Sequence, residues 1–174
     1  MGVTGHGDCV RFRHDVDEDL ALLSADWVER ELTYVLEDVA APPPGVPVVV
    51  SGTAAGDELL ARLESEGMPA GLAGMGFAGI ADLWMPWCAA HWDGTVASVA
   101  FAARLSPTGA ELGVATAPEA RGHGLAAAVT AAWSAHPDLA GRARFFTTAV
   151  ENHSSRRVAE RLGLRLVGPT ISVP

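Results

Sequence analysis

Residues 116–126 read Thr-Ala-Pro-Glu-Ala-Arg-Gly-His-Gly-Leu-Ala, and the expected fold follows from this stretch. An apolar strand pattern ends at Ala117, Pro118 turns the chain, and a run of small apolar residues with helical character follows Gly122. The first amides of a helix have no partner within the helix, and the helix dipole adds partial positive charge there. Because glycine lacks a Cβ, an anion can approach this backbone closely. The stretch therefore predicts either an anion-binding loop or an ordinary strand-to-helix turn.

The segments on either side of this loop predict a parallel strand–helix–strand unit. Residues 110–117 and 144–150 have the apolar character of buried strands, and residues 122–135 form the helix between them. A crossover of this kind is right-handed in nearly all proteins. The sequence therefore predicts an α/β or α+β domain with a mixed sheet.

Further elements of the second half follow from turn signals. Asp93-Gly94 separates the apolar runs 87–92 and 95–104, which is a strong hairpin signal. A second turn at 106–109 leads into the strand 110–117. Residues 154–162 have one apolar helical face, and residues 164–173 are expected to form a last strand.

The first half has weaker patterns. Leu20, Leu23, Trp27 and Leu36 recur near helical spacing, so we expect a helix from about Asp15 or Asp17 to Asp38. The run 46–50 contains Pro47 and is at best an edge strand. Residues 56–66 are expected to form a helix, whereas residues 67–81 show no clear period.

Length and composition indicate one folded domain. The chain has 174 residues, of which 49% are hydrophobic, which is enough for one sizeable core. No apolar run reaches the roughly 18 residues that a membrane span needs. The first residues also lack a secretory signal pattern. We therefore expect a single cytoplasmic domain that does not enter a membrane.

Charge and residue usage exclude several classes of protein. The chain contains no lysine, which excludes the ordinary P-loop NTPases and PLP enzymes, because both need one. The net charge is −9 and no basic stripe is present, so we expect no nucleic-acid partner. Residues 1–87 hold 15 acidic residues against four arginines. This imbalance favours a cationic ligand on that half, or is simply a solvated helix face.

The loop and its surroundings resemble the acyl-CoA-binding motif of the GNAT superfamily of N-acetyltransferases. Arg121, Gly124 and Ala126 have the spacing R-x-x-G-x-A, and Val114, Thr116 and Pro118 precede them as V-x-T-x-P. A second similarity lies downstream, where Asn152-His153-Ser154-Ser155 is followed by Leu162-Gly163-Leu164. The resemblance covers roughly residues 85–170 and is strongest to an uncharacterised bacterial branch. It implies a mixed, mainly antiparallel central sheet flanked by helices, with the parallel unit holding the CoA site.

The resemblance implies a donor site for acetyl-CoA. Val114 and Thr116 would pair their backbone with the pantetheine arm, and Asn152 and Ser155 would contact it. For Asn152 the alternative is a helix cap, and for Ser155 a helix-start residue. The loop amides that would hold the CoA pyrophosphate belong to Arg121, Gly122, His123, Gly124, Leu125 and Ala126.

The catalytic groups are less well defined. Glu111 is the best candidate for the general base, although it lies one residue later than the glutamate of some relatives and has a structural role as its alternative. His91 is the second candidate. Many relatives carry a tyrosine acid seven residues after the asparagine, where this chain has Ala159. Its only tyrosine is Tyr34, so water, Cys88, Ser155 or solvent are left to take part in the final proton transfer.

These observations lead to one functional expectation and one alternative. We expect an N-acetyltransferase that moves an acetyl group from acetyl-CoA directly to a primary amine of a small molecule or peptide. The alternative is a CoA-binding or regulatory module with weak catalysis. Residues 1–85 would be the variable amine-side half and residues 86–174 the acyl-CoA-binding core of one domain, which could form a homodimer. We expect no metal, because His6, Cys9, His14 and Asp15 fit no common site.

The tryptophans leave two interpretations open. Trp84, Trp87 and Trp92 cluster around the expected hairpin. We expect them to lie in the core, but they could instead form the wall of an aromatic acceptor pocket.

Overall fold

A computed structural model describes residues 29–41 and 44–172. Its centre is a mixed sheet in which the described strands have the order β2-β3-β4-β5-β6-β1-β7. All neighbouring pairs are antiparallel except β5 and β6, which are parallel. The strands are β1 Glu29–Val35, β2 Val48–Val50, β3 Trp87–Trp92, β4 Thr95–Leu105, β5 Gly109–Thr116, β6 Ala143–Ala149 and β7 Arg165–Ser172. The predicted mixed, mainly antiparallel sheet with one parallel unit is confirmed.

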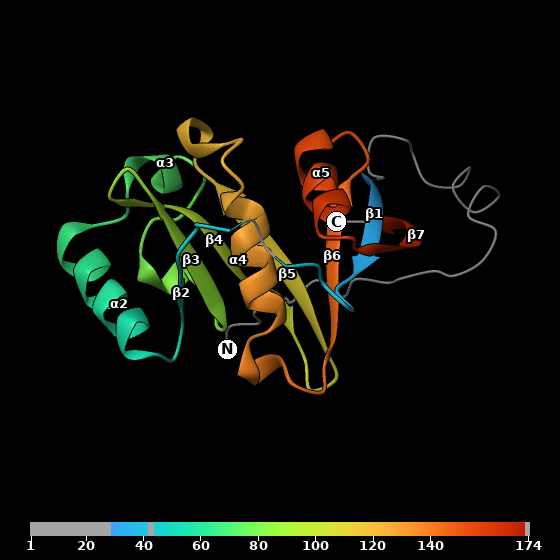
Figure 1. Ribbon diagram of the computed structural model, residues 1–174, viewed down its shortest axis with the longest axis horizontal. Coiled ribbons are helices and arrows are strands. Elements are labelled where there is room, and N and C mark those ends of the chain that lie inside the picture. The colour runs from blue at the N-terminus through green and yellow to red at the C-terminus, as the bar shows by residue number, and fades with distance from the viewer. Residues whose placement is uncertain (1–28, 42–43, 173–174) are drawn as a thin grey trace, which may run out of the picture.

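Helices cover the sheet as Figure 1 shows, with α4 and α5 over its middle and α2 and α3 beside β2, β3 and β4. Short 3₁₀ turns lie at Ile80–Asp82, Pro118–Ala120 and Pro137–Leu139. The α-helices are α2 Ala54–Glu66, α3 Ala70–Ala73, α4 Leu125–Ser134 and α5 His153–Arg161. The helices predicted at 56–66, 122–135 and 154–162 are therefore present, with shifted ends. Residues 67–81, for which the sequence shows no period, contain α3 and the first 3₁₀ turn.

Turn chemistry accounts for the hairpin between β3 and β4. Asp93 and Gly94 both have positive φ, 49° and 78°, as a tight two-residue hairpin turn requires. Trp92 pairs with Thr95 directly across the turn. The hairpin predicted from Asp93-Gly94 is confirmed.

The prediction of a helix that ends at Asp38 is wrong for its described residues, 29–38. Residues 29–35 form β1, which lies between β6 and β7 and pairs with both. The segment Leu32-Thr33-Tyr34-Val35 alternates between the two sheet faces, and Tyr34 packs against Phe146 in the core. Tertiary pairing on both edges outweighs the helical spacing of the leucines, because an inserted strand satisfies its backbone on both sides. Residues 15–28 of that prediction lie outside the described residues.

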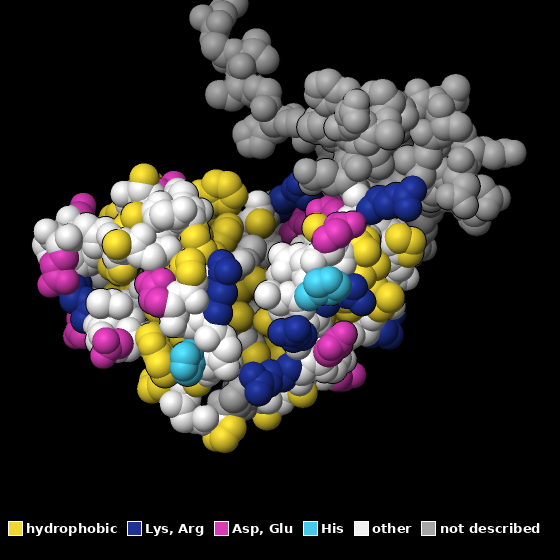
Figure 2. Space-filling model, turned by 90° about the horizontal axis from the view of Figure 1, so that it is seen from above, with side chains coloured by type: hydrophobic (Ala, Val, Ile, Leu, Met, Phe, Trp, Pro, Cys, Tyr) yellow, Lys and Arg dark blue, Asp and Glu magenta, His cyan; other side chains and the backbone are white. Residues whose placement is uncertain are grey.

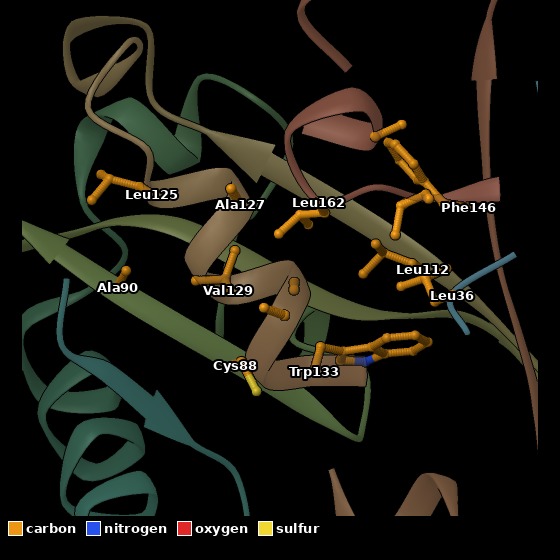
Figure 3. Close-up of a cluster of buried hydrophobic side chains, with 14 of the residues drawn as sticks. Leu36, Cys88, Ala90, Leu112, Leu125, Ala127, Val129, Trp133, Phe146 and Leu162 are labelled. Carbon is orange, nitrogen blue, oxygen red and sulfur yellow. The ribbon is translucent and has the colours of Figure 1, made fainter. Parts of the chain in front are cut away.

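Two apolar cores lie on opposite faces of the sheet. The core under α4 and α5 is shown in Figure 3, where Val129 and Trp133 of α4 lie over the strands. Trp133 is buried and its Nε1–H donates to the carbonyl of Pro86, 2.8 Å away. The second core joins Leu59 and Leu63 of α2 to Trp87 and Val99. Alternate strand residues thus hold helices on both faces and fix α4 beside β5.

Candidate functional site

The parallel strands β5 and β6 pair over only part of their length. Their register runs from Gly109↔Ala143 to Leu112↔Phe146 and ends there. Beyond that point β6 continues beside β1, where Thr148 pairs with Leu32. Among the described strands, none pairs with the last residues of β5 on this side, which leaves their backbone available to an extended ligand.

The direction of the β5 backbone groups shows which residues face this opening. The amide of Ala117 donates to the carbonyl of Ala97, and the hydroxyl of Ser98 donates to the carbonyl of Ala115. The amide of Ala117 and the carbonyl of Ala115 therefore point toward β4. Directions alternate along a strand. Val114 and Thr116 therefore direct their main-chain groups away from β4, as predicted for the pantetheine-binding positions.

The loop after β5 places unpaired amides beside the same opening. Gly122 and Gly124 have φ of 85° and 82°, a left-handed conformation that favours glycine. Gly124 is the N-cap of α4 and supplies no side-chain acceptor to the first-turn amides. These amides stay available for an external anion, with the dipole of α4 behind them.

Helix α5 borders the opening from the side of β6. Asn152 caps this helix, because its Oδ1 accepts from the amide of Ser155 at 3.0 Å. The cap, which the sequence left as an alternative for Asn152, is thus observed. Both residues also line the pocket described next.

A pocket of about 760 Å³ lies between the end of β5, the N-terminus of α4 and α5. It brings together nearly all the residues that the sequence predicts for the donor site. His123 is absent from its lining. The predicted residues that line it are Val114, Thr116, Arg121, Gly122, Gly124, Leu125, Ala126, Asn152 and Ser155.

Two further arginines line this pocket that sequence reasoning missed. Arg157 and Arg161 lie one helical turn apart on α5, on the side that faces the opening. Together with Arg121 they make the lining cationic, and none of the described lining residues is acidic. Figure 2 shows arginine side chains gathered around a hollow on this face. The i, i+4 spacing after Asn152 was the available signal in the sequence.

Glu111 does not line this pocket. Its carboxylate Oε2 lies 2.8 Å from Nη1 of Arg104, and the side chain is 14% exposed. A bulge in β4 between Ala102 and Arg104 brings the two residues opposite each other. Glu111 shares its sheet face with Gly113, across which the ring of Phe101 lies so closely that a Cβ at Gly113 would come within 2.4 Å of it. The assignment of Glu111 as the base stays a prediction.

Ser155 is the one candidate proton donor in the pocket lining, whereas His91, Cys88 and Tyr34 lie away from it. His91 Nε2 is 2.8 Å from Arg62 Nη2, and burial together with the charge of Arg62 lowers the pKa of His91. Cys88 is fully buried in the core, and burial raises the pKa of its thiol to about 12. Tyr34 lies on β1 and not on a helix, and Ala159 lies on the buried face of α5.

The hairpin tryptophans divide between core and surface. Trp87 is buried, as expected. Trp84 is 53% exposed and Trp92 is 38% exposed, so the core prediction is wrong for these two. Trp84 packs edge-on against Phe101, whereas Trp92 lies against His123 with the two rings tilted by 31°.

Ser51, His136 and Asp138 contain the residue types of a hydrolase triad, but their hydrogen bonds run in the wrong direction. The amide of Asp138 donates to Nδ1 of His136, so in the neutral ring the proton lies on Nε2. Nε2 therefore donates to Ser51, 3.1 Å away, and has no lone pair to accept the hydroxyl proton. Ser51 and His136 form a buried structural link between the end of β2 and the end of α4, and Asp138 is exposed.

Metal ligands do not converge in the part of the chain that is described: no three His, Cys, Asp or Glu side chains come together there. The cluster considered at His6, Cys9, His14 and Asp15 lies outside the described residues.

The sequence profile of the acetyltransferase (GNAT) domain matches residues 61–165. The chain belongs to the GNAT family of acetyltransferases. Members of this family typically use acetyl-CoA as the acyl donor. The matched range contains β5, the glycine loop, α4 and α5, so the pocket coincides with the conserved domain. No functionally curated protein matches the sequence.

Solved structures of GNAT proteins share the fold. A GNAT-family protein from Novosphingobium aromaticivorans is 25% identical with a TM-score of 0.53, covering 84% of this chain and 63% of that one. An acetyltransferase from the GNAT family of Colwellia psychrerythraea is 16% identical with a TM-score of 0.58, covering 95% and 64%. A GCN5-related N-acetyltransferase-like protein from Streptococcus suis is 20% identical with a TM-score of 0.54, covering 92% and 69%. This chain thus spans less than two thirds of the first two structures.

None of the helices that the structure describes is both long and apolar enough to cross a membrane.

Proposed function

We propose that this GNAT-family chain is an N-acetyltransferase that uses acetyl-CoA and transfers the acetyl group directly to a primary amine of a small molecule or peptide. The observation that carries the proposal is the pocket where the unpaired end of β5, the uncapped N-terminus of α4 and the arginines of α5 meet. Backbone groups of β5, amides of α4 and guanidinium groups of α5 could all bind one elongated anionic ligand there.

The lining of the pocket fits the parts of acetyl-CoA in turn. The first amides of α4 and the guanidinium of Arg121 suit a pyrophosphate. Main-chain groups of Val114 and Thr116 suit the amides of a pantetheine arm, which an open strand edge binds as an added strand. Arg157 and Arg161 suit further phosphate charge, since guanidinium–phosphate hydrogen bonds are strong.

The chemistry requires an amine without its extra proton. An ammonium with a pKa near 10 is not a nucleophile, so a base must remove a proton before the nitrogen attacks the thioester carbonyl. The new C–N bond forms as the C–S bond breaks, and the thiolate leaving group takes a proton. Glu111 is the base in this proposal, and the proton for the thiolate comes from water or Ser155, since Cys88 is enclosed in the core.

The acceptor is a cationic amine in this proposal. The acidic residues concentrated in the first half of the chain favour a polyamine, an aminoglycoside or a peptide amine over an anionic amino acid. Preferred acetylation of an acidic amino acid in an amine panel would contradict this choice.

A CoA-binding module with weak catalysis is the second candidate. It is favoured by Ala159, which occupies the position of the usual tyrosine acid, is fully buried and carries no proton donor. Release of CoA thiol over a broad amine panel decides between the two candidates. Binding of acetyl-CoA without release would favour the module.

Calorimetric titration with acetyl-CoA tests the shared basis of both candidates. We expect the wild type to bind and Gly124→Glu to lose binding, because the new carboxylate would stand at the anion site and strain a left-handed position. Gly67→Glu is the matched control, because Gly67 has nearly the same φ, 84°, at the end of α2. Absence of binding by the wild type would overturn the proposal.

A further inference from the structure

The glycine loop has an unusual external contact. The imidazole of His123 stacks on the indole of Trp92, with ring centroids 3.7 Å apart and an angle of 31° between the planes. His123 belongs to the loop that supplies Arg121, Gly122 and Gly124 to the pocket, but does not itself line the pocket. The stack therefore joins the loop to a different element, the last residue of β3.

The loop has few strong restraints of its own. Two glycines flank His123, and glycine loses more backbone freedom on ordering than any other residue. The internal hydrogen bonds are long: Arg121 Nε to the carbonyl of Thr116 and His123 Nδ1 to the carbonyl of Ala120 each measure 3.3 Å. The backbone bond from Arg121 to Pro118 is also 3.3 Å. These distances are longer than those of strong hydrogen bonds, so a contact with another element should contribute to the conformation of the loop.

Trp92 offers a firm support for that contact. It lies beside the tight Asp93-Gly94 turn, pairs with Thr95, and its carbonyl accepts from the Thr95 hydroxyl at 3.2 Å. The hairpin is part of the central sheet, so its end is held by strand pairing on β3 and β4. One aromatic pair thus joins a loop with long internal hydrogen bonds to a strand-paired part of the fold.

We propose that Trp92 is a positioning residue of the donor site, which holds the Arg121–Gly124 loop in the conformation that receives the pyrophosphate. The inference rests on the proposed binding of acetyl-CoA. Without the stack, only a fraction of molecules would have the loop in this conformation, and the apparent Kd rises in inverse proportion to that fraction. Trp92 itself makes no contact with the ligand in this account.

Calorimetric titration with CoA tests the positioning role. We expect Trp92→Ala and His123→Ala each to raise Kd by about three- to tenfold, the factor that corresponds to one aromatic pair. Trp92→Phe and His123→Phe keep a stacked pair and should return Kd close to that of the wild type. Trp84→Ala is the matched control, because it removes another exposed tryptophan of the same region that stacks on Phe101 and not on the loop.

Two further readouts separate positioning from a general structural role. The double variant Trp92→Ala/His123→Ala should bind CoA no more weakly than either single variant, because both remove the same contact. The affinity for pantetheine, which lacks the pyrophosphate, should not change in Trp92→Ala. Equal losses for CoA and pantetheine, additive effects in the double variant, or failure of Trp92→Phe to restore binding would each overturn the inference.

The outcome also distinguishes this inference from the proposed function. If wild-type protein does not bind CoA, the proposed function fails and the inference fails with it. If wild-type protein binds CoA and Trp92→Ala binds equally well, the donor site stands and only the role of Trp92 is rejected.

Discussion

Glu111 and Arg104 form an ion pair across the bulge of β4, with 2.8 Å between Oε2 and Nη1. The arginine side chain is 61% exposed, whereas the glutamate is 14% exposed. A carboxylate held in this way can serve as a base only if the amine substrate reaches it on this sheet face. The pair therefore provides a direct way to separate a catalytic from a structural role for Glu111.

Replacing Glu111 by Gln should slow acetyl transfer by about 10²-fold, because the amide cannot accept the proton of the amine. The measurement is steady-state thiol release with an amine that the wild type acetylates. Glu64→Gln, an exposed change on α2, is the control. If Arg104→Ala reduces kcat as much as Glu111→Gln does, the ion pair is structural and another group is the base.

Removing the α5 arginines should weaken acetyl-CoA binding. We expect Arg157→Ala and Arg161→Ala each to raise Kd by about tenfold, the loss expected for a hydrogen bond to a charged group. The wild-type Kd should also rise with salt, because part of the attraction is screened. Arg165→Ala is the control, since Arg165 is exposed and pairs with Glu37. An unchanged Kd in the double variant would remove both arginines from the donor site.

The pKa of His91 should lie below its usual value of 6.5, because burial and then the charge of Arg62 disfavour the imidazolium. NMR titration of the histidine resonances measures this value, with His91→Asn identifying the signal. Arg62→Ala should raise the pKa only part of the way, because burial is the larger cause. The unfolded chain binds a proton at His91 at a higher pH than the folded chain does. The free energy of unfolding should therefore fall as the pH falls below 6.5. A wild-type pKa at or above 6.5 would contradict the prediction.

Cys88 should be unreactive in the folded protein. Its pKa near 12 leaves almost no thiolate at pH 8, and its side chain has no exposed surface. In a Cys9→Ser background, a thiol reagent should label Cys88 only after denaturation.

The raised pKa of Cys88 also predicts that the folded protein loses stability at alkaline pH. The thiol ionises near pH 9 in the unfolded chain and near pH 12 in the folded one. Between these values the free energy of unfolding should therefore fall by up to about 1.4 kcal/mol for each unit that the pH rises. Denaturant titrations from pH 8 to 11 measure this slope, and Cys88→Ala in the same background should remove it. An equal slope in both proteins would show that other groups cause the loss of stability.

Sequence patterns predicted most of the residues that line the pocket because its parts are local. The end of β5, the two glycines and the start of α4 follow one another within a dozen residues, and turn chemistry determines each of them. The position of Asn152 at the start of α5 is equally local, since a cap acts on the amides of its own helix. These residues meet in one pocket, as the sequence predicted.

The structure of the first half of the chain could not be predicted in the same way. The strand β1 and the helical expectation up to Asp38 show why: Leu36 fits both periods, and only pairing with β6 and β7 decides between them. The exposure of Trp84 and Trp92 likewise depends on which elements pack against the hairpin. Residue type alone does not report these distant neighbours.

Sequence patterns were enough to predict the parallel β5–α4–β6 unit, its glycine loop and the order of the second-half elements, because each depends on turns and periods within a short segment. Packing in three dimensions is what separates β5 from β6 after Leu112, places Arg157 and Arg161 at the same pocket, and brings the Trp92 ring against His123. These relationships join residues far apart in the chain. They depend on how strands and helices pack in space, which local propensity does not encode.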